Sequence, residues 1–331
     1  MTNLVRVGLI VGAIGLALGV AGAPKASAAS CPGGTYYVTE RFGGKVVKVV
    51  VDATCSAATT DFVTGLPSAG PDSIVFDHHG HVVISNPDVE TLTLADATTG
   101  AIINAHLNDP TVNGGILFPQ TADLAMDPNS DNVWAIGYGN GGIATVNSQT
   151  GATHIFADFG HPLGGIAFST SGRLFVSTHD GYVFELDPMT GAVLDTLSVG
   201  GFLDGMSYDS YSGRLFISGC SGFCEVAVTP SLSFVASRVL PYSSDGVSAN
   251  GKGQVIWVGN SSLNSFNEAD SSNMVLAGGI YSADDSAPAS GAGASTATPE
   301  LGSGELLGTG LLPLGLALLV RRRRARRAPQ Q

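Results

Sequence analysis

Short apolar runs separated by glycine-containing turns recur along the middle of the chain. The clearest copy occupies residues 164–194, where strand-like runs at 164–168, 174–177 and 182–186 alternate with turns. Runs of this length, rich in valine, isoleucine and phenylalanine, predict short β-strands, and the glycine and Asp-Pro-x-Thr-Gly turns predict tight connections. The unit therefore holds four strands, the fourth near 193.

The same unit returns about every 41 residues. Five copies align on one apolar residue of the first strand, which we call the anchor. The anchors are Ile74, Leu124, Ile166, Met206 and Val247. Four short strands per unit of this length are typical of β-propeller blades. The sequence therefore predicts an all-β fold, a β-propeller of six four-stranded blades over residues 29–284.

The first unit of the chain is incomplete. Strands predicted at 35–39, 46–51 and 59–63 match the second, third and fourth strands of a blade whose first strand is missing. A segment from the other end of the propeller completes such a composite blade and protects its edge, and we expect residues 278–281 to supply it. This segment follows the preceding strand more closely than in the other units. The sequence therefore leaves open whether the ring closes in this way, and the number of blades is fixed only to within one.

The units resemble the repeats of NHL-like and YVTN-like bacterial propellers, most closely at Pro162-Leu163-Gly164-Gly165-Ile166-Ala167. The resemblance covers most of residues 31–280. It relates the chain to the gluconolactonase-like and streptogramin-lyase-like propellers and implies their fold. It does not imply one activity, because propellers host many unrelated functions.

The sequences at both ends of the chain predict targeting segments. Residues 1–28 combine one arginine, an uncharged apolar stretch and Ala26-Ser27-Ala28, which predicts a cleaved signal peptide. Residues 285–300 form a linker rich in small residues, and 301–331 join a short apolar run to an arginine-rich end. This tail resembles the PEP-CTERM sorting class, with Leu301 where that class usually has proline. The alternative is a retained transmembrane helix, and both place the propeller outside the cell.

The charge of the chain is unevenly distributed. The formal net charge is −12, but six of the fifteen basic residues lie in the last eleven positions, so the propeller region is more acidic than the total. This excess of acids argues against nucleic acid as a partner. We expect a monomeric propeller whose partner is a protein or glycan at the cell surface, and whose tail contacts the membrane.

The four cysteines allow three disulfide connectivities, and disulfides persist in an exported protein. Cys220 and Cys224 bracket a tight hairpin, which brings their Cα atoms within bonding range. Cys31 and Cys55 then pair and tie the start of the propeller to its first strand pair. Four free thiols are the alternative.

Acidic residues recur where the first strands begin. This set consists of Asp72, Asp123, Asp204 and Asp245, with Gly164 in the corresponding place of one blade. Propeller symmetry points several of them at the mouth of the central channel, where His161 and His179 lie on the same face. Converging carboxylates suit Ca²⁺, with Asp72, Asp204 and Asp245 as the candidate ligands. The alternative is that each carboxylate bonds backbone N–H groups of its own strand.

Asp77-His78-His79-Gly80-His81 looks like a metal motif, but it falls in a turn between first and second strands, on the opposite face. We therefore interpret it as a surface turn. Together, the repeats, the targeting segments and the acidic residues favour an exported, surface-tethered binding or scaffold module. Ca²⁺ bound at the acids would stabilise this module. The alternative function is a metal-dependent hydrolase or lyase, lactonase-like or streptogramin-lyase-like, with its site at the channel mouth.

Overall fold

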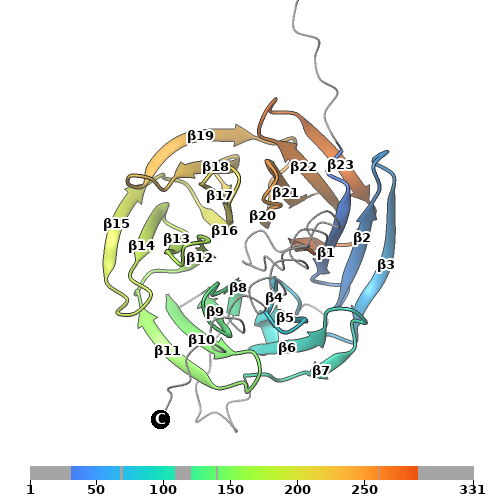
Figure 1. Cartoon of the computed structure of the whole chain (residues 1–331), viewed down its shortest axis with the longest axis horizontal. Helices are drawn as coiled ribbons and strands as arrows, with labels where there is room; N and C mark the ends of the chain where they lie inside the picture. Colours follow the sequence, from blue (N-terminus) through green and yellow to red (C-terminus); the bar gives the residue numbers. More distant parts are fainter. Residues whose placement is uncertain (1–30, 68–69, 109–120, 139–140, 260, 290–331) are drawn as a thin grey trace, which may run out of the picture. The chain divides into compact units, whose positions relative to one another are not determined.

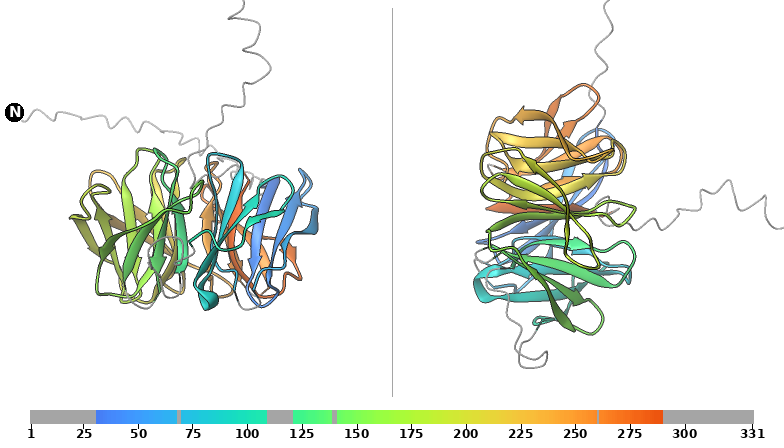
Figure 2. Two further views of the ribbon diagram at one scale, coloured as in Figure 1. Left: turned by 90° about the horizontal axis from the view of Figure 1, so that it is seen from below. Right: turned by 90° about the vertical axis from the view of Figure 1, so that its left-hand side faces the viewer.

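The computed structural model describes residues 31–67, 70–108, 121–138, 141–259 and 261–289. Their strands form six four-stranded antiparallel sheets, which stand as blades around a central axis (Figure 1). The chain is therefore a six-bladed β-propeller, and the predicted fold class and blade count are confirmed. Side views show that the strands run roughly along the axis, so their connections gather on two faces (Figure 2).

Within each blade, the strands follow one another from the axis to the rim. Blade 1 contains β24 (Ala283–Pro288), β1 (Gly34–Glu40), β2 (Lys45–Val51) and β3 (Ala57–Thr64). Blade 2 contains β4 (Ile74–Phe76), β5 (His81–Asn86), the short 3-10 helix η1 (Pro87–Val89), β6 (Thr91–Asp96) and β7 (Ile102–Asn104). Blade 3 contains β8 (Thr121–Met126), β9 (Asn132–Gly137), β10 (Gly142–Asn147) and β11 (Thr153–Asp158).

The remaining blades repeat the plan. Blade 4 contains β12 (Leu163–Phe168), β13 (Leu174–Thr178), β14 (Tyr182–Leu186) and β15 (Val193–Ser198). Blade 5 contains β16 (Leu203–Asp209), β17 (Arg214–Gly219), β18 (Gly222–Ala227) and β19 (Ser233–Val239). Blade 6 contains β20 (Val247–Ala249), β21 (Gln254–Gly259), β22 (Ser262–Asn267) and β23 (Asn273–Gly278).

The hydrophobic core lies between the blades. Buried apolar side chains fall into six clusters, and each cluster joins two neighbouring blades. Phe216 and Phe223 of blade 5, for example, pack with Trp257 of blade 6, and all three are at most 1% exposed. Apolar burial thus holds each blade to the next, and each blade depends on both neighbours for its stability.

The composite blade exists, but a different segment completes it. The predicted closing strand at 278–281 is wrong: β23 ends at Gly278, and β24, which begins at Ala283, pairs with β1 from Tyr36↔Pro288 to Glu40↔Ala283. The chain needs residues 279–282 to cross from the rim to the axis, and Gly279 and Ser282 both have positive φ there. The expected boundary at residue 284 accordingly falls within a strand, and the propeller reaches Pro288.

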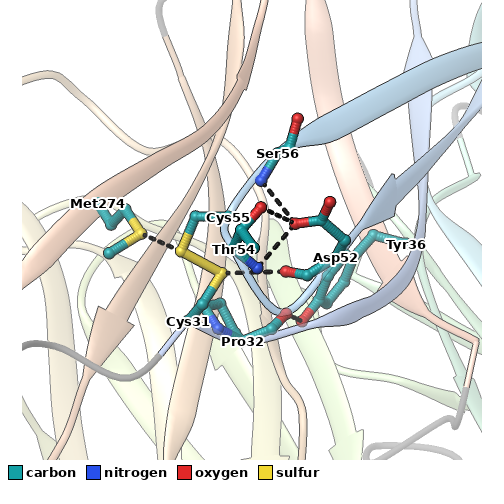
Figure 3. The surroundings of a disulfide bond; sticks show 8 residues. All are labelled: Cys31, Pro32, Tyr36, Asp52, Thr54, Cys55, Ser56 and Met274. Atoms are coloured by element: carbon teal, nitrogen blue, oxygen red, sulfur yellow. Dashed lines mark hydrogen bonds between the residues drawn. A yellow bond between two sulfur atoms is a disulfide. The ribbon is translucent and has the colours of Figure 1, made fainter.

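A disulfide lies at the seam where the ring closes (Figure 3). Cys31 bonds to Cys55, and the sulfur of Cys55 lies 3.3 Å from that of Met274 in blade 6. The second disulfide joins Cys220 to Cys224 across the β17–β18 hairpin. Both pairs match the predicted connectivity, and no described cysteine is free.

The segments predicted to act in targeting, a signal peptide at 1–28 and a tail at 301–331, lie outside the described residues. Within the described part of the chain, no helix is long and apolar enough to cross a membrane.

Removing β24 tests the closure. We expect a chain truncated after residue 282 to lose stability and to aggregate, because β1 would expose an unpaired edge and Ala287, 8% exposed, would leave the core. Thermal melting and size-exclusion chromatography measure this. A chain truncated after residue 289 is the control; equal melting temperatures for the two would contradict the assignment of β24.

Candidate functional site

A cavity of about 220 Å³ opens at the axis, on the face that carries the hairpins between second and third strands. We call it the channel cavity, and this face the mouth face. Seven carboxyl groups line it: Asp72, Asp88, Asp123, Asp204, Asp245, Asp284 and Asp285. Arg41, from the β1–β2 hairpin, is the one basic residue among the described lining residues. The cavity is therefore strongly acidic.

All four acids predicted from the repeats line this cavity, but they do not form one ring. Asp72, Asp204 and Asp245 each stand two residues before the anchor of their blade, whereas Asp123 stands one residue before Leu124. The structure adds Asp284 and Asp285, in the same two positions relative to Ser286, which pairs with Val38. There are consequently two tiers of acids.

The outer tier contains Asp72, Asp204, Asp245 and Asp284. Hydroxyl groups of the second strands hold three of these residues through their backbone carbonyls. Thr39 donates to the carbonyl of Asp72 (2.5 Å), Ser177 to that of Asp204 (3.3 Å) and Ser218 to that of Asp245 (2.6 Å). Each bond crosses from one blade to the next, so the packing of neighbouring blades fixes the position of the acids.

The inner tier contains Asp123 and Asp285, and its hydrogen bonds link neighbouring blades at the axis. Asp123 accepts hydrogen bonds from the backbone of its own Leu124 (2.8 Å) and of Ile166 in blade 4 (2.8 Å). The hydroxyl of Ser73 lies 2.9 Å from Asp123 Oδ1 and 3.0 Å from Asp285 Oδ2. One hydroxyl proton satisfies only one carboxylate, so this arrangement favours a proton on the other. The inner tier is structural.

Two positions in the tiers hold glycine, because neighbouring inner strands leave no room there for a larger side chain. A Cβ atom at Gly164 would lie 2.1 Å from the carbonyl oxygen of Leu203, so an aspartate cannot replace it without moving blade 5. A Cβ atom at Gly246, in the inner tier, would lie 2.4 Å from Asp285 Oδ1. At these two positions, neighbouring inner strands approach too closely for an aspartate side chain.

Burial raises the pKa of three outer-tier acids, Asp72, Asp204 and Asp284. It raises the pKa of Asp204 to about 7, and the charges of Asp245 and Asp123 add to the shift. Burial and the charge of Asp72 raise the pKa of Asp284 to about 10. Burial also raises the pKa of Asp72 well above its usual range, against the opposing charge of Arg41.

Arg41 is shared among several acids. Its guanidinium lies 3.6 Å from Asp284, 3.7 Å from Asp72 and 3.7 Å from Asp88. In the inner tier, burial raises the pKa of Asp123 to about 6, although hydrogen bonds from Ile166 and Ser73 oppose it. Burial raises the pKa of Asp285 as well, with a contribution from Asp123. One arginine therefore leaves most of the acidic charge uncompensated.

The predicted histidines do not join the acids. His179 stacks on Phe202 at 4.3 Å between ring centroids and meets Tyr138 edge-on at 4.5 Å. Burial lowers the pKa of His179, which keeps it neutral. His161 pairs instead with Asp180, 3.4 Å away. Neither histidine lines the channel cavity.

The histidine-rich turn between β4 and β5 holds three rings with three different partners. His78 Nε2 lies 3.0 Å from the carbonyl oxygen of Asp127, and His79 Nε2 lies 2.9 Å from Asp131. His81 Nδ1 lies 2.9 Å from Asp77. The rings therefore do not converge. More widely, no three histidine, cysteine or acidic side chains are grouped closely enough for a metal within the described residues.

Sequence reasoning missed Arg41, Tyr138, Asp284 and Asp285. The signal for the last two was present, because Asp284-Asp285 repeats the position of Asp72-Ser73 before an inner strand. Arg41 and Tyr138 lie in hairpins whose direction no local pattern fixes.

No protein-family model matches the chain, and a search of curated proteins finds no match. Solved structures do resemble it. A chain of the nidogen/laminin complex is 12% identical with a TM-score of 0.61, and the alignment covers 77% of this chain and 98% of that one. Virginiamycin B lyase from Staphylococcus aureus is 9% identical with a TM-score of 0.54, covering 74% of this chain and 81% of that one. These likenesses establish the fold class, a β-propeller.

The raised pKa values predict a stability that depends on pH. Asp204 has a pKa of about 7 in the folded state and about 3.9 when unfolded, so the folded state holds more protons between these values. Stability present below the unfolded pKa is then lost as the pH rises through about 7. We expect Asp204→Asn to raise the melting temperature by a few degrees above that pH and to flatten its decline. Asp158→Asn, at an exposed turn, is the control; parallel melting curves for wild type and Asp204→Asn would contradict the account.

Proposed function

We propose that this chain is an exported β-propeller, tethered at the cell surface, that serves as a binding or scaffold module through its mouth face. One observation carries the proposal. Seven carboxyl groups line the channel cavity, backbone N–H groups and Ser73 satisfy the two inner-tier acids, and Arg41 is the single cation beside the outer-tier acids among the described lining residues. A site of this kind is suited to a positively charged ligand.

A calcium ion is the simplest such ligand. Asp72, Asp204 and Asp245 supply hard oxygen donors, which Ca²⁺ prefers, and Asp284 adds a fourth carboxyl group. Their side chains are not close enough to hold an ion as they stand, so binding requires them to rotate towards one another. Ligand carboxylates must be ionised, so binding would release protons from Asp204 and Asp284, whose pKa values burial raises. Arg41 competes for the same acids.

Export and tethering draw support from two sources. Both predicted disulfides are present, which suits a protein from an oxidising compartment. The sequence of residues 1–28 suits a signal peptide, and that of 301–331 suits a sorting tail or a membrane anchor. The nidogen/laminin complex gives an instance of a similar fold in a protein complex.

A metal-dependent hydrolase or lyase is the second candidate, because virginiamycin B lyase shares the fold. Such chemistry needs a proton-transferring group in the site, most often a histidine. His179 is enclosed by Tyr138 and Phe202, and His161 faces Asp180. The geometry therefore favours binding over catalysis.

Calcium titration tests the proposed cation site. We expect Ca²⁺ to raise the melting temperature of the wild-type protein and EDTA to reverse the effect, because an ion bound only by the folded state stabilises it. The double variant Asp204→Asn/Asp245→Asn should melt identically with and without Ca²⁺. Asp158→Asn is the matched control. Isothermal titration calorimetry measures the stoichiometry, and a wild-type protein indifferent to Ca²⁺ would remove the calcium site.

A further inference from the structure

A second, larger hollow adjoins the channel cavity on the mouth face. It is an open groove of about 780 Å³ between blades 5 and 6, which we call the blade 5–6 groove. Asp204 and Asp245 line both the groove and the channel cavity. A group that lies in the groove therefore has direct access to the outer-tier acids.

Exposed aromatic side chains mark this groove. Phe202, 51% exposed, lies in the loop before β16, and Tyr242, 50% exposed, lies in the loop before β20. Large aromatic groups that remain half exposed are frequent anchors of protein interfaces, where their burial contributes binding energy. Because both side chains are exposed, neither stabilises the fold by core packing.

The groove is rigid where it meets these aromatics. Cys220 lines it, and its disulfide to Cys224 fixes the β17–β18 hairpin that forms one wall. Phe202 also stacks on His179, which in turn meets Tyr138 at the edge of the channel cavity. A preorganised wall of this kind loses little conformational entropy on binding.

The charge of the groove has one sign. Its described lining residues include Asp204 and Asp245 but no lysine, arginine or histidine. In the adjoining channel cavity, the side chain of Asp284 is 7% exposed, and its Oδ2 atom receives no hydrogen bond, with Arg41 no closer than 3.6 Å. Asp284 belongs to the channel cavity, and the acids that face the groove are Asp204 and Asp245.

We infer that the blade 5–6 groove binds a basic segment of a protein partner, with a lysine or arginine side chain placed against Phe202 and Tyr242 and its charge directed to Asp204 and Asp245. Cations bind the faces of aromatic rings, and carboxylates complete their neutralisation. The inference rests on the proposed function in that both use the mouth face and share Asp204 and Asp245. It adds the partner's chemistry and a site outside the channel cavity.

A labelled peptide of alternating lysine and glycine is the probe, measured by fluorescence anisotropy in EDTA, with the same peptide carrying glutamine for lysine as its control. We expect the lysine peptide to bind and the glutamine peptide not to bind. Phe202→Ala and Tyr242→Ala should each weaken binding about fivefold, the loss typical of one cation–aromatic contact. Phe202→Tyr, which keeps an aromatic ring at this position, should bind the lysine peptide as tightly as the wild type.

Tyr211→Ala is the matched control, because Tyr211 is 68% exposed in the β16–β17 turn on the opposite face. Equal binding by wild type, Phe202→Ala and Tyr211→Ala would overturn the inference, since it would show attraction by net charge alone. Absence of binding to the wild type would overturn it too. Calcium titration of the same variants separates the two proposals: Phe202→Ala should keep its response to Ca²⁺ even if the peptide does not bind.

Discussion

The pairing of β24 with β1 is the contact on which the rest of the structure depends. It joins the two ends of the propeller and leaves β1 without a free edge. The same strand brings Asp284 and Asp285 to the axis and lets Asp285 meet Ser73 of blade 2. The pairing of β24 with β1 therefore both closes the ring and completes the acidic lining of the channel cavity.

Closure also explains the electrostatics of the axis. Inner strands from all six blades converge there, and carboxyl groups at their starts crowd one another. The inner tier is satisfied by backbone N–H groups and Ser73, whereas the outer tier shares a single arginine, and burial raises the pKa of Asp204 and of Asp284. A fold that stores uncompensated acids in this way is poised to bind a cation, at the expense of its stability when the site is empty.

Most of the fold could be predicted because its signals are local. Anchors such as Ile166 and turns such as the one at Gly191 recur at a fixed spacing, and the β17–β18 hairpin brings its cysteines together without help from distant residues. β24 was misplaced because Ala283–Pro288 has no apolar alternation, and only its long-range partner β1 makes it a strand. Asp123 was grouped with Asp72, Asp204 and Asp245 in one set, although it stands one residue before its anchor and they stand two residues before theirs. The aromatic stack around His179 depends on loop conformations that no repeat encodes.

Amide hydrogen exchange, followed by mass spectrometry, tests the central claim most directly. If β24 closes the ring, peptides from residues 283–288 should be protected as strongly as those from β1, and both should become exposed in the same cooperative step as denaturant is added. Rapid exchange of residues 283–288 alongside a protected β1 would contradict closure by this strand, and with it the assignment of Asp284 and Asp285 to the channel cavity.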